Sequence, residues 1–135
     1  MSDPVAAEVA EDEFLRLCEA LDVDLDDMDA EDRETFEDIK KPIVRAIRKG
    51  RVVIDDKGQP TVRLKYPVGD VASVTFYRPT GATIMAAGDS RKKNEVEKLM
   101  LMMADITKQP TVVFTKMDDV ADGKLCRGIT RLFLA

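Results

Sequence analysis

Hydrophobic residues near the start of the chain repeat at the spacing of an amphipathic helix. The first stripe, at positions i, i+3, i+4 and i+7, consists of Phe14, Leu17, Cys18 and Leu21. This spacing predicts a helix from Glu11 to about Asp22. The residues before it lack apolar periodicity, so we expect residues 1–10 to be a disordered acidic leader.

A second stripe predicts a longer helix that ends at Gly50. Its hydrophobic positions are Phe36, Ile39, Ile43 and Ile47. Asp29 offers an N-cap, and acidic residues in the first turn with basic residues in the last turn agree with the helix dipole. Pro42 lacks a backbone N–H and predicts a kink or a restart. Residues 11–50 are therefore expected to form an acidic helical region.

After Gly50 the hydrophobic period falls to two, which predicts strands. The runs RVVID and TVRLKYP flank a turn, DKGQP, in which Gly58 supplies a positive φ, and the three predict a β-hairpin. The alternating run VASVTFYRP predicts a third antiparallel strand. We expect Pro67 and Pro79 to end strands, because proline cannot donate to the ladder.

The last part of the chain returns to helical spacing. Helices are expected in GATIMAAG, stopped by Gly88, then from about Asn94 to Lys108, and finally from Asp118 to Leu134. Leu125, Ile129, Leu132 and Phe133 would form the buried side of the final helix. The expected fold class is α+β, with a small antiparallel sheet (a hairpin plus a third strand), a mainly helical C-terminal half, acidic N-terminal helices, and residues 51–135 as one α+β domain.

Charge divides the chain into an acidic first part and a basic remainder. Residues 1–39 contain 16 acidic and 2 basic residues, whereas residues 40–135 contain 10 acidic and 19 basic residues. Opposite charges on one chain attract at low salt, so the acidic part is a candidate mask over a basic binding surface. The basic cluster at residues 91–93 has no aromatic neighbour for base stacking, which disfavours a nucleic-acid partner.

The composition argues against catalysis and against a bound metal. Histidine is absent, and Cys18 and Cys126 lie far apart in apolar helical patterns that predict buried thiols. In the acidic run 22–29, a calcium loop would need glycine where Asp27 stands and glutamate where Arg33 stands. No phosphate-binding loop or nucleophile motif is present. We therefore expect a non-enzyme without a cofactor or a metal site.

The segment KLMLMMADI predicts a surface for a protein partner. It places three of the 7 methionines within four positions and spreads apolar side chains around more than one helix face. Methionine is frequent both at adaptable binding surfaces and in plain cores, and the sequence leaves both interpretations open. The candidate partner-binding residues are Leu99, Met100, Met102, Met103, Ile106 and Phe133.

From about Thr61 onward, the order of segments resembles a family of phage proteins. The segments LKYPV, VTFYRPTGATIMAAG, LMLMMADITKQP and FTKMDDVADGKLCRGITRLFL follow the order found in small tail assembly chaperones of Mu-like and related long-tailed bacteriophages. The corresponding elements are a turn at Arg78, Pro79, Thr80 and Gly81, a helix at Leu99 to Ile106, and a final opening at Met117, Asp118 and Asp122. Residues 11–57 depart from the family pattern.

The resemblance implies a non-virion factor in the host bacterial cytoplasm that binds the tape-measure and tail-tube proteins during tail morphogenesis. An apolar, methionine-rich helix face suits helix-in-groove binding of a long helical partner. Self-association is a further option. The N-terminus lacks the pattern of a signal peptide, and no apolar run is long enough for a membrane span, so we expect no membrane partner. Two alternatives stay open: a structural tail or neck component of the virion, and a small DNA-binding regulator.

Overall fold

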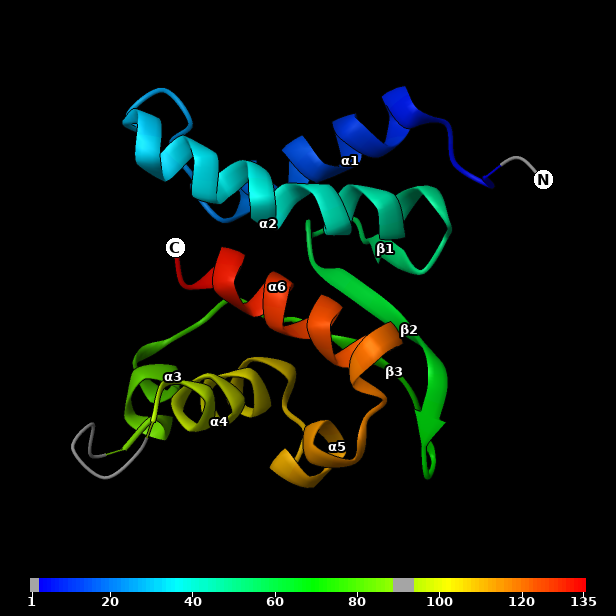
Figure 1. The fold of residues 1–135 in the computed structure, drawn as a ribbon, viewed down its shortest axis with the longest axis vertical. Coiled ribbons are helices and arrows are strands. Elements are labelled where there is room, and N and C mark those ends of the chain that lie inside the picture. The colour runs from blue at the N-terminus through cyan, green and yellow to red at the C-terminus, as the bar shows by residue number, and fades with distance from the viewer. Residues whose placement is uncertain (1–2, 89–93) are drawn as a thin grey trace.

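The computed structural model describes residues 3–88 and 94–135 and has the expected α+β class (Figure 1). The helices are α1 (Ala7–Ala20), α2 (Ala30–Arg48), α3 (Gly81–Ala86), α4 (Glu95–Thr107), α5 (Thr111–Lys116), the π-helix η1 (Asp119–Gly123) and α6 (Lys124–Phe133). The strands are β1 (Val52–Ile54), β2 (Pro60–Val68) and β3 (Val71–Thr75). They form one antiparallel sheet in the order β1-β2-β3, as predicted.

Helix α6 lies in the middle of the molecule, between two helical groups (Figure 1). It packs against α2 on one side and against α4 on the other, while α1 lies along α2 and α3 lies along α4. The predicted inner side of α6 is confirmed, because Leu125, Ile129, Leu132 and Phe133 are all buried. A single core therefore connects the first and last helices. None of the helices in the described residues is both long and apolar enough to cross a membrane.

The two N-terminal helices agree with their predicted stripes but differ in extent. Helix α1 begins at Ala7, and Ala10 is fully buried, so residues 7–10 are helical and not part of a disordered leader. Helix α2 runs unbroken through Pro42, so of the two predicted effects, a kink or a restart, the restart does not occur. Pro42 and Asp38 both lie on the exposed side, where water can bond the Asp38 carbonyl that proline leaves without a partner.

Local signals at the two ends of α2 and in the hairpin turn are confirmed. The Asp29 side chain accepts a hydrogen bond from the Asp32 N–H at 2.8 Å and caps α2, and Gly50 adopts a φ of +74° after its last turn. Gly58 has a φ of +79° in the hairpin turn, and a Cβ there would lie 2.5 Å from the Cβ of Ala20. This position therefore requires glycine for two independent reasons.

The predicted strand ends at the two prolines are wrong. Strand β2 continues through Pro67 to Val68, because its pairing with β3 shifts register between Arg63 and Val68 and demands no ladder hydrogen bond from Pro67. Strand β3 ends before Pro79. There the chain leaves the sheet, and the Tyr77 N–H donates to the carbonyl of Ile106 at 3.0 Å.

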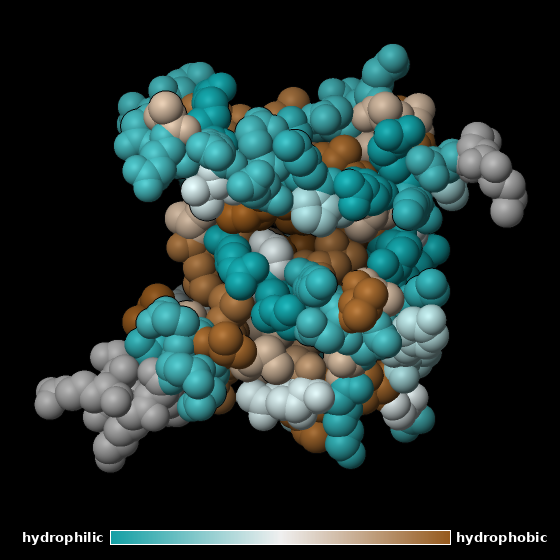
Figure 2. Space-filling model, viewed as in Figure 1, coloured by the Kyte–Doolittle hydropathy of each residue, from teal (hydrophilic) through white to brown (hydrophobic). Residues whose placement is uncertain are grey.

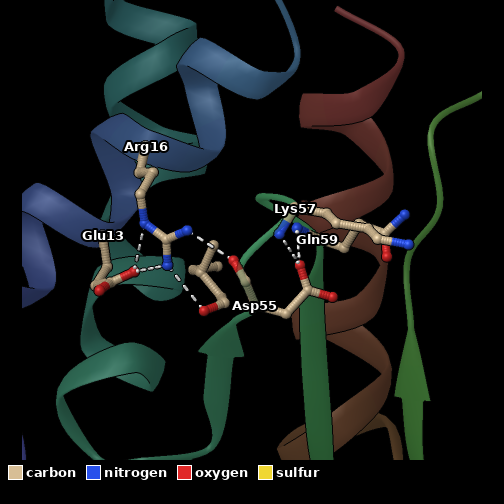
Figure 3. A network of polar contacts seen from close by, with 6 residues as sticks. Glu13, Arg16, Asp55, Lys57 and Gln59 are labelled. Carbon is tan, nitrogen blue, oxygen red and sulfur yellow. Dashed lines mark hydrogen bonds and ion pairs between the residues drawn. The ribbon is translucent and has the colours of Figure 1, made fainter.

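Arg16 joins α1 to the β-hairpin (Figure 3). Its guanidinium donates to the Asp55 carbonyl at 2.6 Å and to the Ile54 carbonyl at 2.9 Å, and it pairs with Glu13 one turn away. The Asp55 carboxylate in turn accepts the N–H groups of Lys57 and Gln59, each at 2.9 Å, and holds the turn. One arginine thus satisfies the carbonyls at the end of β1.

The C-terminal part contains two elements that were not predicted. Helix α5 follows Pro110, where a connection was expected, and the predicted final helix opens as the π-helix η1 before it becomes α6. Asp118 does cap this opening, because its carboxylate accepts the Ala121 N–H at 2.8 Å. The basic cluster at 91–93 lies outside the described residues.

Candidate functional site

Helix α4 carries most of the predicted partner-binding residues. The Asn94 side chain caps it by accepting the Glu97 N–H at 2.8 Å, and acidic residues in the first turn agree with the helix dipole. At its other end, the Thr107 hydroxyl donates to the Met103 carbonyl at 2.8 Å and is thereby satisfied inside the core. Side-chain hydrogen bonds therefore hold the helix at both ends.

The structure divides the six predicted residues into two groups. Met103, Ile106 and Phe133 are 1%, 2% and 8% exposed, and the ring of Phe133 packs 5.7 Å from that of Phe76. These three belong to the core and have too little exposed surface to contact a partner directly, which corrects their placement on an outer surface. Leu99, Met100 and Met102 are partly exposed, with Met100 also packed against the core.

Leu99 and Met102 line a shallow concavity, which we call the apolar hollow. It has a volume of about 330 Å³ and lies between the first turns of α4 and the end of α6. Its lining residues are Glu95, Val96, Leu99, Met102, Arg131 and Leu134. Apolar side chains gather at this edge of the molecule, where α6 ends below α2 (Figure 2). Val96, 63% exposed, and Leu134 were not among the predicted site residues.

The neighbouring helix α3 adds exposed apolar side chains. Ile84 and Met85 are 67% and 81% exposed. Thr80 begins α3 with a capping box, and the Thr83 hydroxyl donates to the Asp105 carboxylate at 2.5 Å, which ties α3 to α4. The segment GATIMAAG could have indicated these exposed apolar side chains, because a helix of 6 residues cannot bury apolar side chains on every face.

A second concavity, which we call the cationic groove, has a volume of about 830 Å³. It lies between the end of α2, strand β2 and the start of α6. Its cationic lining residues are Arg45, Lys49, Arg51, Arg63, Lys65 and Lys124, and its other lining residues are Pro42, Ala46, Gly50, Leu64, Val120, Ala121 and Leu125. No pattern along the sequence predicts this site, because its residues come from three distant segments.

A buried carboxylate holds the walls of the cationic groove together. Asp122 is fully buried and accepts a hydrogen bond from the Arg51 guanidinium, which also donates to the Ala121 carbonyl at 3.1 Å. The same carboxylate accepts the backbone N–H groups of Lys65 at 2.9 Å and Tyr66 at 3.1 Å. Asp122 thus joins β2 to the π-helix that precedes α6.

The acidic part of the chain does pair with the basic part, but away from this groove. Asp3 lies 3.4 Å from Arg48, Glu11 lies 2.9 Å from Lys40, and Asp22 pairs with Arg78. No residue before Pro42 lines the cationic groove among those described. The predicted masking therefore does not cover this surface in the structure.

The two thiols are buried, as predicted, and are weak nucleophiles. Burial raises the pKa of Cys126 to about 12, with a further increase from the charge of Asp122. Burial likewise raises the pKa of Cys18 to about 11, partly offset by Lys40. Because the thiolate is the reactive form, neither side chain is suited to attack at neutral pH. Across residues 3–88 and 94–135, no three His, Cys, Asp or Glu side chains are grouped as metal ligands would be.

Comparison of the chain with protein-family models, curated proteins and solved structures finds no match. The resemblance of residues 61–135 to tail assembly chaperones therefore stays a prediction. The two concavities are the candidate binding surfaces of the described residues.

Proposed function

We propose that this protein is a non-catalytic assembly chaperone that holds an apolar helical segment of a partner protein in the apolar hollow. The observation that carries the proposal is the division of α4 into two apolar faces. Met103 and Ile106 face the core, while Val96, Leu99 and Met102 leave apolar surface open beside the end of α6. A helix that is apolar on a second, exposed face is suited to a partner.

The size of the hollow suits a small number of anchoring side chains. Its volume of about 330 Å³ lies at the lower end of the range for ligand cavities, roughly 300–1,000 Å³. An apolar helix laid along α4 would place one or two large side chains there, with Glu95 and Arg131 at the rim. So small an anchor gives modest affinity, which agrees with a chaperone that later releases its partner.

Within this proposal, the partners are the tape-measure and tail-tube proteins of a long-tailed phage, met in the cytoplasm of the host bacterium. The resemblance of residues 61–135 to tail assembly chaperones supports these partners. A tape-measure protein, as a long apolar helical chain, has the chemistry that the apolar hollow would accept.

A charged substitution in the hollow tests the proposal. Met102→Asp should leave the protein folded but reduce recovery of the tape-measure protein at least about tenfold, because an unpaired carboxylate would be buried in the interface. Val112→Asp is the matched control, since Val112 on α5 is 47% exposed and does not line the hollow. Tagged proteins would be pulled down from phage-producing cells and quantified by mass spectrometry, with circular dichroism to check folding.

Three outcomes would contradict the proposal. Unfolding of Met102→Asp would place Met102 in the core. Equal recovery by both variants would show that the hollow does not bind the partner. Presence of the chain in purified virions would favour the structural role over the chaperone role.

A further inference from the structure

The cationic groove brings together six cations, and only one of them forms an ion pair with a described residue. Arg51 is paired with Asp122, but the other five cations of the groove form no ion pair with the described acidic residues. These are Arg45 on α2, Lys49 directly after α2, Arg63 and Lys65 on β2, and Lys124 on α6, and all five are exposed. The groove therefore gathers five exposed cations without an ion pair in one concavity.

The floor of the groove is apolar. Ala46, Leu64 and Leu125 contribute buried side chains, and Val120 stands at the edge with 83% of its surface exposed. Over the start of α6 the surface is hydrophilic with small apolar areas (Figure 2). An occupant that matches both features must combine negative charge with apolar side chains.

We propose that the cationic groove is a docking site for an acidic, amphipathic segment of a partner protein. Carboxylates of that segment would meet the rim cations, and its apolar side chains would lie on Ala46, Leu64 and Leu125. The site is distinct from the proposed chaperone surface, because the groove and the hollow share no lining residue. The two surfaces can therefore be tested separately.

The lining favours a polypeptide over a nucleic acid. Single-stranded nucleic acids bind through aromatic side chains that stack on bases, and no aromatic residue lines the groove. A duplex presents phosphates and sugars, for which an apolar floor offers no partner. Leucine or isoleucine side chains of an acidic helix do fit such a floor.

Binding of a designed peptide tests the proposal with the whole protein. The probe is a fluorescent 14-residue helical peptide with glutamates on one face and leucines on the other, and the matched probe carries glutamines in place of the glutamates. Fluorescence anisotropy at low salt should show at least about tenfold tighter binding of the acidic peptide. Equal affinity of the two peptides, or no binding, would overturn the proposal.

Charge reversal tests whether the acidic peptide binds in the cationic groove. Arg63→Glu combined with Lys124→Glu should weaken binding of the acidic peptide at least about tenfold, because attraction is lost and repulsion is added at two positions. The control combines Lys57→Glu with Lys116→Glu, two exposed cations outside the groove, and changes the net charge equally. Equal weakening by both double variants would show non-specific attraction and would overturn the proposal.

Two further measurements make the result independent of variant folding and of the proposed chaperone activity. In the unaltered protein, the acidic peptide should shift the amide NMR signals of Gly50, Lys65 and Ala121; shifts confined to the hollow would overturn the proposal. Met102→Asp should bind the peptide as the parent does, so that failure at one surface does not imply failure at the other. Tighter binding of a 15-base-pair DNA duplex than of the peptide would overturn the proposal, because it would indicate that the groove binds nucleic acid and not a protein segment.

Discussion

The two ends of α6 border surfaces of opposite character. Arg131 and Leu134 at its end border the apolar hollow, whereas Lys124 and Leu125 at its start border the cationic groove. The hollow is built mainly from α4, so the spacing along one helix was enough to suggest it. The groove combines three segments that are distant in sequence. The sequence pattern of one helix indicates its apolar faces, whereas only the tertiary fold shows which charged residues from distant segments lie together.

The largest effect should come from removing the carboxylate beneath the cationic groove. Asp122→Ala leaves the Arg51 guanidinium and two backbone N–H groups without their buried acceptor, which should reduce the free energy of unfolding by about 3–5 kcal/mol. Asp119→Ala is the control, because the exposed pair of Asp119 with Arg127 should contribute less than about 1 kcal/mol. Urea unfolding of both variants checks this, and equal losses would contradict the structural role of Asp122.

Adjacent methionines on α4 should differ sharply in their effect on stability. Met103→Ala creates a cavity in the core and should cost about 3 kcal/mol, because the residue is only 1% exposed. Met102→Ala removes a partly exposed side chain from the apolar hollow and should cost less than about 1 kcal/mol. Thermal and urea unfolding would measure both. Similar losses of stability in the two variants would show that Met102 and Met103 do not differ in burial.

Gly58, which lines neither surface, provides a purely structural reference. Gly58→Ala combines a φ of +79° with a Cβ placed 2.5 Å from that of Ala20, and should cost about 2–3 kcal/mol. Gly69→Ala has a φ of +56°, but no described atom lies within 4 Å of the new Cβ, so about 1 kcal/mol is expected. A difference in urea midpoint between the variants would isolate the contact with Ala20, and identical midpoints would exclude its importance.

Ionic strength should affect binding at the two surfaces differently. Raising the ionic strength from 0.05 to 0.5 M should weaken binding of the acidic peptide to the cationic groove by about tenfold, because rim charges become screened. Binding of an apolar helical partner in the hollow should change by less than about twofold, since apolar contacts are not screened. Parallel titrations at both salt concentrations test this. A similar salt dependence at both sites would show that the two surfaces do not differ in the electrostatic part of their binding.

The smallest effect concerns pH and the inner side of α6. Cys126 has a pKa of about 12 in the folded protein against an ordinary value of 9.0, so the unfolded chain loses this proton first as the pH rises. Its contribution lowers the free energy of unfolding between about pH 9 and pH 12, by about 1 kcal/mol at pH 9.5 relative to pH 7. Urea unfolding at both pH values should show a smaller decrease for Cys126→Ala. If the free energy of unfolding decreases as much in Cys126→Ala as in the parent, the Cys126 thiol has the same pKa in the folded and the unfolded protein.

Much of the fold was predictable because its signals are local. The stripe beginning at Phe14, the cap at Asp29 and the turn at Gly58 each depend on a few neighbouring residues, and all are confirmed. The errors arose where distant contacts decide. Burial of Ala10 extends α1, and a shift in strand pairing accommodates Pro67 inside β2.

The candidate sites were predictable only in part. Apolar periodicity could not say which methionine faces inward, because α4 is apolar on more than one side, and the structure places Met103 inside and Met102 at the hollow. The cationic groove was visible only as an excess of positive charge after residue 39. Arg63 and Lys124 line the same groove only because β2 packs against the π-helix η1, which leads into α6.

The central position of α6 also determines when the protein can finish folding on the ribosome. Helix α2 emerges early in synthesis, yet one of its packing partners is α6, which is synthesised after every other described helix. Until then the buried face of α2 lacks the cover that α6 provides. The first two helices and the hairpin can form beforehand from contacts close in sequence. The nascent chain thus completes its core only when α6 has left the exit tunnel.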